Sequence, residues 1–340
     1  MAQEGTWRPR IDRPFRGGSV LLALLFGCAL ICVCLPRFNR QEVLSPRWIP
    51  DSRRPAPRAS TDATQYAAQV MHFRGEAMHR KLRAPFAYRP LAPFLASRLP
   101  LKPMTALNLV NIAALLVALA CIDGTIAALG LGASSRLAGA ALFTFSFPVF
   151  YYGAIGYVDP VAIACISAGV LFIVRQQWWA LALVLVIGAL TKETTIVLLP
   201  AAVARLALGP GTIRRKAAVS VAMLACFAAA TVLARGLAPG TGTHLWTPSL
   251  AALARNASRP RAWIAFSLSF GLPGVLSSRK LPALLWRRTE TTPPALTALA
   301  VGCAAVLAVA LYSFVAASAD GRFLWLLYPF AIPIAVARRS

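Results

Sequence analysis

Apolar residues in this sequence come in long uninterrupted blocks, separated by short segments that carry arginine or lysine. Blocks of this length suit helices that cross a lipid bilayer, because about 20 apolar residues span its hydrocarbon core. Hydrophobic residues make up 58% of the 340 positions, whereas a soluble domain has about 45–50%. The sequence therefore predicts an all-α, polytopic transmembrane helical bundle. It argues against a soluble enzyme, a disordered chain and an outer-membrane β-barrel, whose strands would show short alternating segments.

About ten spans fit these blocks. Residues 1–18 are predicted to form a cytoplasmic N-terminal segment, and residues 19–340 a single transmembrane domain. The break at 191–194 leaves the count open by one or two. The predicted spans are 19–36, 104–122, 136–152, 160–175, 178–190, 194–207, 217–234, 262–277, 294–317 and 323–337.

The chain is strongly basic, with 35 Lys+Arg against 11 Asp+Glu and a formal net charge of +24. A nucleic-acid partner is not expected, since no basic stripe with interleaved aromatic residues lies on a soluble domain. The basic residues flank the apolar blocks instead, as they do where charge sets the orientation of membrane proteins. The arginine and alanine bias indicates a bacterial genome rich in GC. We therefore predict a multi-pass protein of the bacterial inner (plasma) membrane with both termini in the cytoplasm.

Residues 37–103 form the one long polar stretch and are predicted to be the first extracytoplasmic loop. Its first half, up to residue 60, is rich in proline and arginine and is expected to be irregular. Apolar residues at helical spacing over 61–82 predict an amphipathic helix lying at the membrane interface. The prolines of the following segment, 85–93, are expected to prevent the helix from continuing.

This topology places the acids near the span ends on the extracytoplasmic face, together with two basic residues. ATP and nucleotide sugars are absent from that face, and the glycine-rich segments of the chain lack the lysine of a phosphate-binding loop. Any group transfer there must take its donor from the membrane. The residues concerned are Asp62, Asp159, Lys192, Glu193, Asp320 and Arg322.

Asp62 is the candidate general base, because a carboxylate at the membrane surface can deprotonate an acceptor hydroxyl or amine. Tyr66 follows one turn later. The alternative is that Asp62 only caps the helix N-terminus. Arg89 lies between Tyr88 and a proline, so it is a candidate phosphate ligand; the alternative is a side chain that reaches to the interface.

Lys192 and Glu193 interrupt an apolar run, and ionisable residues at membrane depth usually face a cavity or a partner. They are candidates to hold a lipid phosphate and to position it; an internal ion pair is the alternative. Asp159, Asp320 and Arg322 lie at predicted outer helix ends. The dipole of a helix N-terminus alone favours an aspartate there.

The remaining polar residues of note predict structural roles. Asn108 and Asn111 are expected to make hydrogen bonds between helices. The histidines, His72, His79 and His244, have no metal-site spacing, and the seven cysteines fit small buried apolar positions better than a zinc site.

Three pieces of the chain resemble the GT-C superfamily of membrane glycosyltransferases, which includes the protein mannosyltransferases and the lipid A aminoarabinose transferases. They are residues 62–66 leading to Tyr88-Arg89-Pro90-Leu91, residues 178–194 with Lys192-Glu193, and Gly321-Arg322-Phe323-Leu324. The resemblance extends over most of residues 19–337.

The resemblance implies a polyprenyl-phosphate-linked sugar as donor and transfer with inversion to a lipid, glycan or protein acceptor. Asp62 would match the catalytic acid of the first loop. Lys192 and Arg89 would hold the phosphate, with Arg322 as a further candidate. No acid stands beside Asp62 and the chain is rich in arginine, so no metal or other cofactor is favoured, although some members of the superfamily use a divalent metal.

Two other functions remain open at this point. A transporter or flippase of an anionic or lipid-linked substrate would place its ionisable residues near the bilayer midplane in broken helices. The predicted topology places the ionisable residues at one face of the membrane instead. A non-catalytic scaffold of an envelope-assembly complex is also compatible with the sequence.

Overall fold

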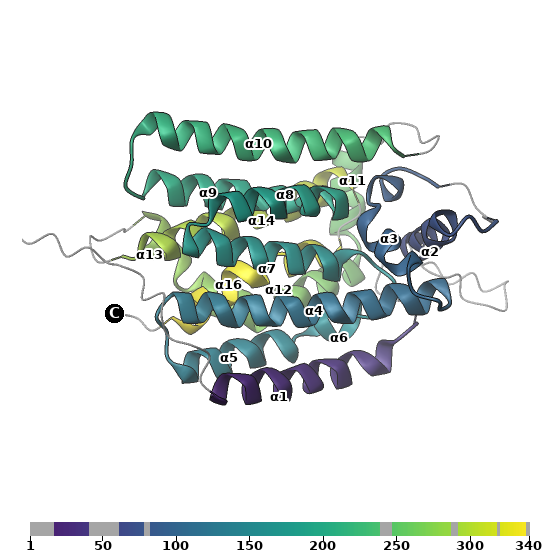
Figure 1. Ribbon diagram of the computed structural model, residues 1–340, viewed down its shortest axis with the longest axis horizontal. Coiled ribbons are helices and arrows are strands. Elements are labelled where there is room, and N and C mark those ends of the chain that lie inside the picture. Colours follow the sequence, from purple (N-terminus) through teal and green to yellow (C-terminus); the bar gives the residue numbers. More distant parts are fainter. Residues whose placement is uncertain are drawn as a thin grey trace, which may run out of the picture.

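The computed structural model of the chain describes residues 17–40, 61–77, 82–238, 247–286, 292–317 and 320–337. Within these ranges every regular element is a helix. Most helices run along the long axis of the molecule, with α1 at one edge and α10 at the other (Figure 1). The all-α bundle is therefore confirmed.

Long and short helices are interspersed along the chain. Their bounds are α1 (Gly17–Cys34), α2 (Thr61–Phe73), α3 (Leu91–Ser97), α4 (Pro103–Ala128), α5 (Ala133–Thr144), α6 (Phe147–Tyr152), α7 (Asp159–Arg175), α8 (Trp178–Thr191), α9 (Leu198–Ala207), α10 (Ile213–Gly236), α11 (Leu250–Ala257), α12 (Pro260–Ser278), α13 (Leu281–Trp286), α14 (Pro294–Ala316), α15 (Arg322–Trp325) and α16 (Tyr328–Val336). Short 3-10 helices cover Leu35–Arg37, Phe86–Tyr88 and Glu193–Val197.

Three helices in the described part of the chain are long and apolar enough to cross a membrane: α4, α10 and α14. Their apolar side chains are only partly covered by the rest of the molecule, and α10 is the most exposed of the three. A surface of this kind suits contact with lipid rather than water. The chain is therefore a membrane protein, and the full set of about ten spans remains a prediction.

Several predicted spans are broken into shorter pieces. The stretch 136–152 divides into α5 and α6, because Ser146 is extended and a new helix begins at Phe147, with Pro148 in its first turn. The stretch 323–337 divides into α15 and α16. Helix α12 is kinked at Gly271, which has a left-handed φ of 53° and precedes Pro273. Broken helices at membrane depth are tolerated where neighbouring protein covers the freed backbone groups.

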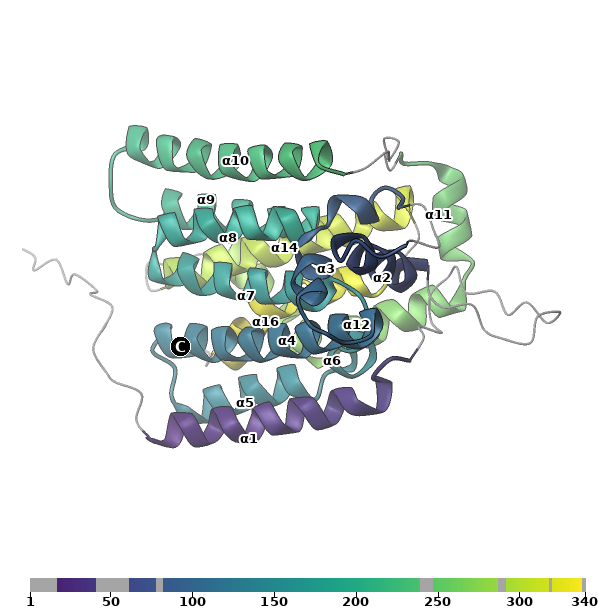
Figure 2. The same cartoon turned by 45° about the vertical axis from the view of Figure 1, so that its right-hand side comes forward.

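Helices α2 and α3, which belong to the predicted loop 37–103, lie at one end of the bundle (Figures 1 and 2). Helix α2 begins at Thr61 as expected but ends at Phe73, because Gly75 has a left-handed φ of 71° that stops a helix. As expected, α2 does not continue through the proline-containing segment 85–93, and a separate helix begins within it. Helix α3 starts at Leu91, and Pro93 fits within its first turn, where no intrahelical N–H bond is required.

Some sequence-based expectations lie outside the described residues. They concern residues 1–16 of the N-terminal segment, most of the proline- and arginine-rich stretch (41–60), residues 78–81 of the predicted amphipathic helix, and His79 and His244.

Candidate functional site

Seven ionisable side chains meet at the end of the bundle that α2 and α3 cover. We call them the ionic cluster: Asp62, Arg89, Asp159, Lys192, Glu193, Asp320 and Arg322. They come from segments that are far apart in sequence, and each was a candidate from the sequence alone. The structure therefore brings together the predicted site residues, with the exception of Tyr88.

Arg322, the first residue of α15, is the centre of one half of the cluster. Its Nη2 lies 2.8 Å from Oδ2 of Asp62 and 2.6 Å from Oδ2 of Asp320. Its Nη1 lies 3.4 Å from Oδ2 of Asp159. Three carboxylates thus converge on a single guanidinium, whose planar fork of donors suits several oxygen acceptors at once.

Lys192 pairs with Asp159 in the most deeply buried part of the cluster. Its Nζ donates to Oδ1 of Asp159 over 2.5 Å, and the Lys192 residue is only 4% exposed. Lys192 is extended between α8 and the following 3-10 helix, whereas Asp159 is the first residue of α7. The break after α8, seen in the sequence as an interruption of the apolar run, is what directs this lysine inward.

Arg89 and Glu193 form the other half of the cluster. Arg89 donates from Nε and Nη2 to the two carboxylate oxygens of Glu193, over 3.0 and 2.8 Å, and from Nη1 to the Tyr66 hydroxyl over 2.9 Å. Burial disfavours ionisation of Glu193, but the charge of Arg89 and its hydrogen bonds outweigh burial and lower the carboxyl pKa to about 2. Burial raises the pKa of the Tyr66 phenol, which therefore stays neutral.

These contacts show how each candidate residue is held. Asp62 lies in the first turn of α2, and its carboxylate binds Arg322. Lys192 and Glu193 each belong to an ion pair, but with Asp159 and Arg89 rather than with one another. Arg89 is buried, so it does not reach out to the interface.

Tyr88 is directed elsewhere. Its ring lies against α10, where the guanidinium carbon of Arg235 is 5.5 Å from the ring centroid. The adjacent Arg89 enters the cluster because Tyr88 ends a single 3-10 turn, and successive residues in such a turn point in different directions.

Two aromatic residues of the site escaped the sequence reasoning. The guanidinium carbon of Arg322 lies 4.2 Å from the centroid of the Tyr157 ring, and Nζ of Lys192 lies 5.2 Å from that of Phe323. An aromatic face stabilises a cation that has lost water. Phe323 follows a candidate residue directly, whereas Tyr157 belongs to an apolar stretch without any chemical signal.

Two asparagines of α4 hold the loop that leads into α7. Asn108 accepts a hydrogen bond from the backbone N–H of Gly156 over 2.6 Å, and Asn111 donates to the carbonyl of Tyr157 over 2.7 Å. The expectation of helix–helix hydrogen bonds was therefore wrong: these side chains bond a loop. They fix the position of Tyr157 and of Asp159, two residues further on.

No group of three or more His, Cys, Asp or Glu side chains placed to hold a metal ion occurs among the described residues. In the ionic cluster the space between Asp62, Asp159 and Asp320 holds the guanidinium of Arg322. The positive charge among these carboxylates is thus supplied by the chain itself.

Comparison with family models, curated proteins and solved structures found no match for this chain.

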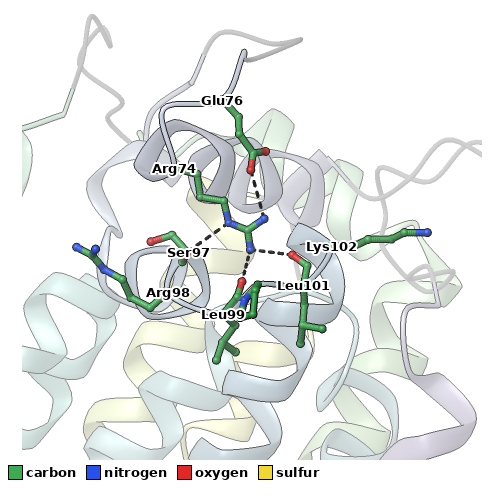
Figure 3. Close-up of a pocket in the computed structure, with 8 residues that line it drawn as sticks. Arg74, Glu76, Ser97, Arg98, Leu99, Leu101 and Lys102 are labelled. Carbon is green, nitrogen blue, oxygen red and sulfur yellow. Dashed lines mark hydrogen bonds and ion pairs between the residues drawn. The ribbon is translucent and has the colours of Figure 1, made fainter.

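A shallow cleft of about 550 Å³ lies beside α2, on the connection from α3 to α4 (Figure 3). Arg74 crosses it, donating to the carbonyls of Leu99 and Leu101 over 2.7 and 2.8 Å and pairing with Glu76. Because these bonds fill the donor groups of Arg74, its role is to fasten α2 to the start of α4. The hydrogen bonds of Arg74 thus help to hold α2, the helix that carries Asp62, in place.

A second cavity of about 770 Å³ opens between α5, α12 and α16. Its lining is mainly apolar and includes Phe145, Leu268 and Leu272, whose side chains are exposed. The kink at Gly271 lies in its wall, with Tyr328 at the start of α16. We call this cavity the apolar groove.

Proposed function

We propose that this chain is a GT-C-like membrane glycosyltransferase of the bacterial inner membrane. It transfers a sugar from a polyprenyl phosphate to a lipid, glycan or protein acceptor on the extracytoplasmic face. The observation that carries the proposal is the ionic cluster, which places the candidate base Asp62 beside Arg322, with Lys192 and Arg89 within the same group of side chains.

In the proposed reaction the oxygen or nitrogen of the acceptor attacks the anomeric carbon of the sugar. The bond from that carbon to the phosphate oxygen breaks, and its electron pair leaves with the polyprenyl phosphate. The acceptor proton passes to the carboxylate of Asp62. Attack opposite to the leaving group inverts the configuration of the sugar. Arg89 and Lys192 stabilise the charge that develops on the leaving phosphate.

The charge of the cluster sets a condition on this step. Three cations face four carboxylates, so the formal net charge is −1. An anionic donor would be repelled unless it displaces a carboxylate from its cation. Glu193 is the carboxylate most open to such an exchange, since its side chain is 39% exposed whereas that of its partner Arg89 is buried. In our proposal the donor phosphate takes the place of Glu193 on Arg89.

The apolar groove supports a lipid-linked substrate. Its exposed apolar lining matches a hydrocarbon chain in chemistry. Tyr328, which lines it, begins α16, and the preceding α15 begins with Arg322. In the proposal the prenyl chain lies in this groove and its phosphate reaches the cluster.

The test uses the full-length protein in proteoliposomes with synthetic polyprenyl phosphates that carry mannose, glucose or aminoarabinose. Release of polyprenyl phosphate is measured in the presence of a membrane extract as the source of acceptor. We expect release from at least one donor, and a loss of about 100-fold or more in Asp62→Asn, as for removal of a general base.

Asp123→Asn is the matched control. Asp123 also pairs with an arginine, Arg136, but it belongs to the far part of α4, away from the cluster. We expect this variant to keep transfer within about twofold, since nothing in the proposed step uses it. Transfer by Asp62→Asn at the level of the wild type would contradict the role of Asp62. Uptake of intact donor into the vesicles without release would favour the transporter.

A further inference from the structure

A second group of basic residues lies at the opposite end of the bundle, where α9 turns into α10 (Figure 1). The group consists of Arg205 near the end of α9 and of Arg214, Arg215 and Lys216 in the first turn of α10. We call it the basic hairpin. It takes no part in the proposed transfer reaction.

Arg205 is buried and has no partner among the residues that the structure describes. The residue is 5% exposed, and its Nε is shielded from solvent and makes no hydrogen bond. It forms no ion pair with any described residue. Each described carboxylate is instead paired with another cation. A charge in such a place is costly unless it is paired and hydrogen-bonded. Its position therefore favours an anion from outside the described residues.

The guanidinium of Arg205 is directed back toward the turn. Its Nη1 lies 3.7 Å from the position that a β-carbon on Gly209 would occupy, so the guanidinium lies beside this turn. Lys216 donates to the carbonyls of Gly209 and Ala207, over 2.6 and 3.1 Å. Arg205 and Lys216 thus both lie against the same turn.

The first turn of α10 adds a second, independent signal. Its N-terminus carries Arg214, Arg215 and Lys216 and no acid. Cations at the positive end of a helix dipole are unfavourable by themselves, whereas an anion there is stabilised. Thr212 satisfies the N–H of Arg215, and the earlier N–H groups of the helix have no intrahelical acceptor. A phosphate group at this position would be attracted both by the basic side chains and by the free N–H groups of the helix N-terminus.

The hairpin also lies at a surface suited to lipid. Ile213 is 83% exposed next to the arginines, and apolar side chains of α10 such as Val221 are exposed further along. Basic pockets between helices at a membrane surface are typical sites for anionic lipid headgroups.

We propose that the basic hairpin binds a phosphate group, with Arg205 as its buried ligand and Arg214 and Arg215 as its outer ligands. The phosphate belongs to an anionic phospholipid or is free phosphate, and the two sources present the same oxygen acceptors to the guanidinium.

The test compares wild-type protein with Arg205→Gln in nanodiscs of phosphatidylcholine, with and without phosphatidylglycerol. Lipid that stays bound is read by native mass spectrometry, and unfolding temperature is measured in both lipids. We expect Arg205→Gln to retain about tenfold less phosphatidylglycerol and to lose the stabilisation that this lipid gives the wild type. In phosphatidylcholine alone the variant should be as stable as the wild type or more so, because an unpaired buried charge has been removed.

Arg175→Gln is the matched control. Arg175 is exposed and ends α7, one short turn before α8, so its loss changes the net charge without touching the hairpin. We expect retention within about twofold. Equal loss in both variants, or unchanged retention in Arg205→Gln, would overturn the proposal.

Two further experiments complete the test. If Arg205→Gln is not recovered as folded protein, the double variant Arg214→Gln and Arg215→Gln, at two exposed positions, is used instead. We expect it to retain about threefold less phosphatidylglycerol than the wild type, and full retention of this lipid would again overturn the proposal. Inorganic phosphate is then added to the wild type. Displacement of the lipid assigns the site to free phosphate, and undisturbed lipid assigns it to a phospholipid headgroup.

Discussion

Arg322 and Asp62 are 260 positions apart in the sequence, and Nη2 of Arg322 donates to Oδ2 of Asp62 over 2.8 Å. This contact joins the helix that covers the end of the bundle to the short helix α15 near the end of the chain. The same guanidinium also binds Asp320 and Asp159. The orientation of the candidate base is therefore set by a residue that serves three carboxylates.

Replacing Arg322 should destabilise the fold. Arg322→Gln leaves three carboxylates without this cation, two of them almost fully buried. Breaking a buried ion pair on one side costs about 3–5 kcal/mol. We expect a fall in the free energy of unfolding of about that size, measured by denaturant unfolding in mild detergent. Arg98→Gln is the control, because Arg98 is exposed and its guanidinium lies over the ring of Phe94, away from the ionic cluster. Equal stability of the two variants would contradict the assignment.

Acid should weaken the link between Arg89 and Glu193. The carboxyl pKa is about 2 in the folded protein and 4.5 ordinarily. A pKa lowered by folding contributes stability above the ordinary value, and that stability is lost as the pH falls from about 4.5 toward 2. We expect the unfolding temperature of the wild type to fall more steeply over this window than that of Glu193→Gln. The difference should be small, because the Glu193 side chain is 39% exposed and water screens the pair. Parallel curves of unfolding temperature against pH for the two proteins would argue against the lowered pKa of Glu193.

Neutralising Glu193 should also strengthen donor binding, if the proposed function holds. Glu193→Gln removes one carboxylate from a cluster of net charge −1 and leaves Arg89 with a neutral partner. A phosphate then displaces a weaker ligand from the guanidinium, since the ion pair with Arg89 is replaced by hydrogen bonds to an uncharged amide. We expect the KM for the polyprenyl-phosphate sugar to fall about threefold or more with little change in kcat. A higher KM would show that Glu193 itself holds the substrate.

The sequence was sufficient to predict the helical class and most of the cluster. Interruption of apolar runs by Lys192-Glu193 and by Asp320 signalled the site, because such residues are costly at membrane depth. The sequence did not predict which side chains of the cluster pair with one another. Whether Lys192 binds Glu193 or Asp159 depends on which helices are neighbours and on the direction that a broken helix gives the side chain. The contact of Tyr157 with Arg322 could not be predicted for the same reason. An aromatic residue in an apolar block gives the same sequence pattern whether it faces lipid or a guanidinium.

Gly321 provides a test of how closely the position of Arg322 is controlled. A β-carbon at this position would lie 2.2 Å from the carbonyl oxygen of Ala265 and 2.4 Å from Oγ of Ser269. Gly321→Ala must therefore push α15 away from α12, and Arg322 moves with it. Overpacking of this kind costs about 1–3 kcal/mol, and the moved guanidinium no longer fits its three carboxylates.

We expect Gly321→Ala to lower the unfolding temperature and to reduce transfer in the proteoliposome assay by about tenfold or more, since small misplacements of catalytic groups are costly. Gly132→Ala is the matched control. Gly132 precedes α5, and a β-carbon there meets no atom within 4 Å. Its substitution should leave both quantities unchanged. If Gly321→Ala is as stable and as active as Gly132→Ala, the contact between α12 and α15 does not position Arg322, and the geometry of the cluster is maintained by its ion pairs alone.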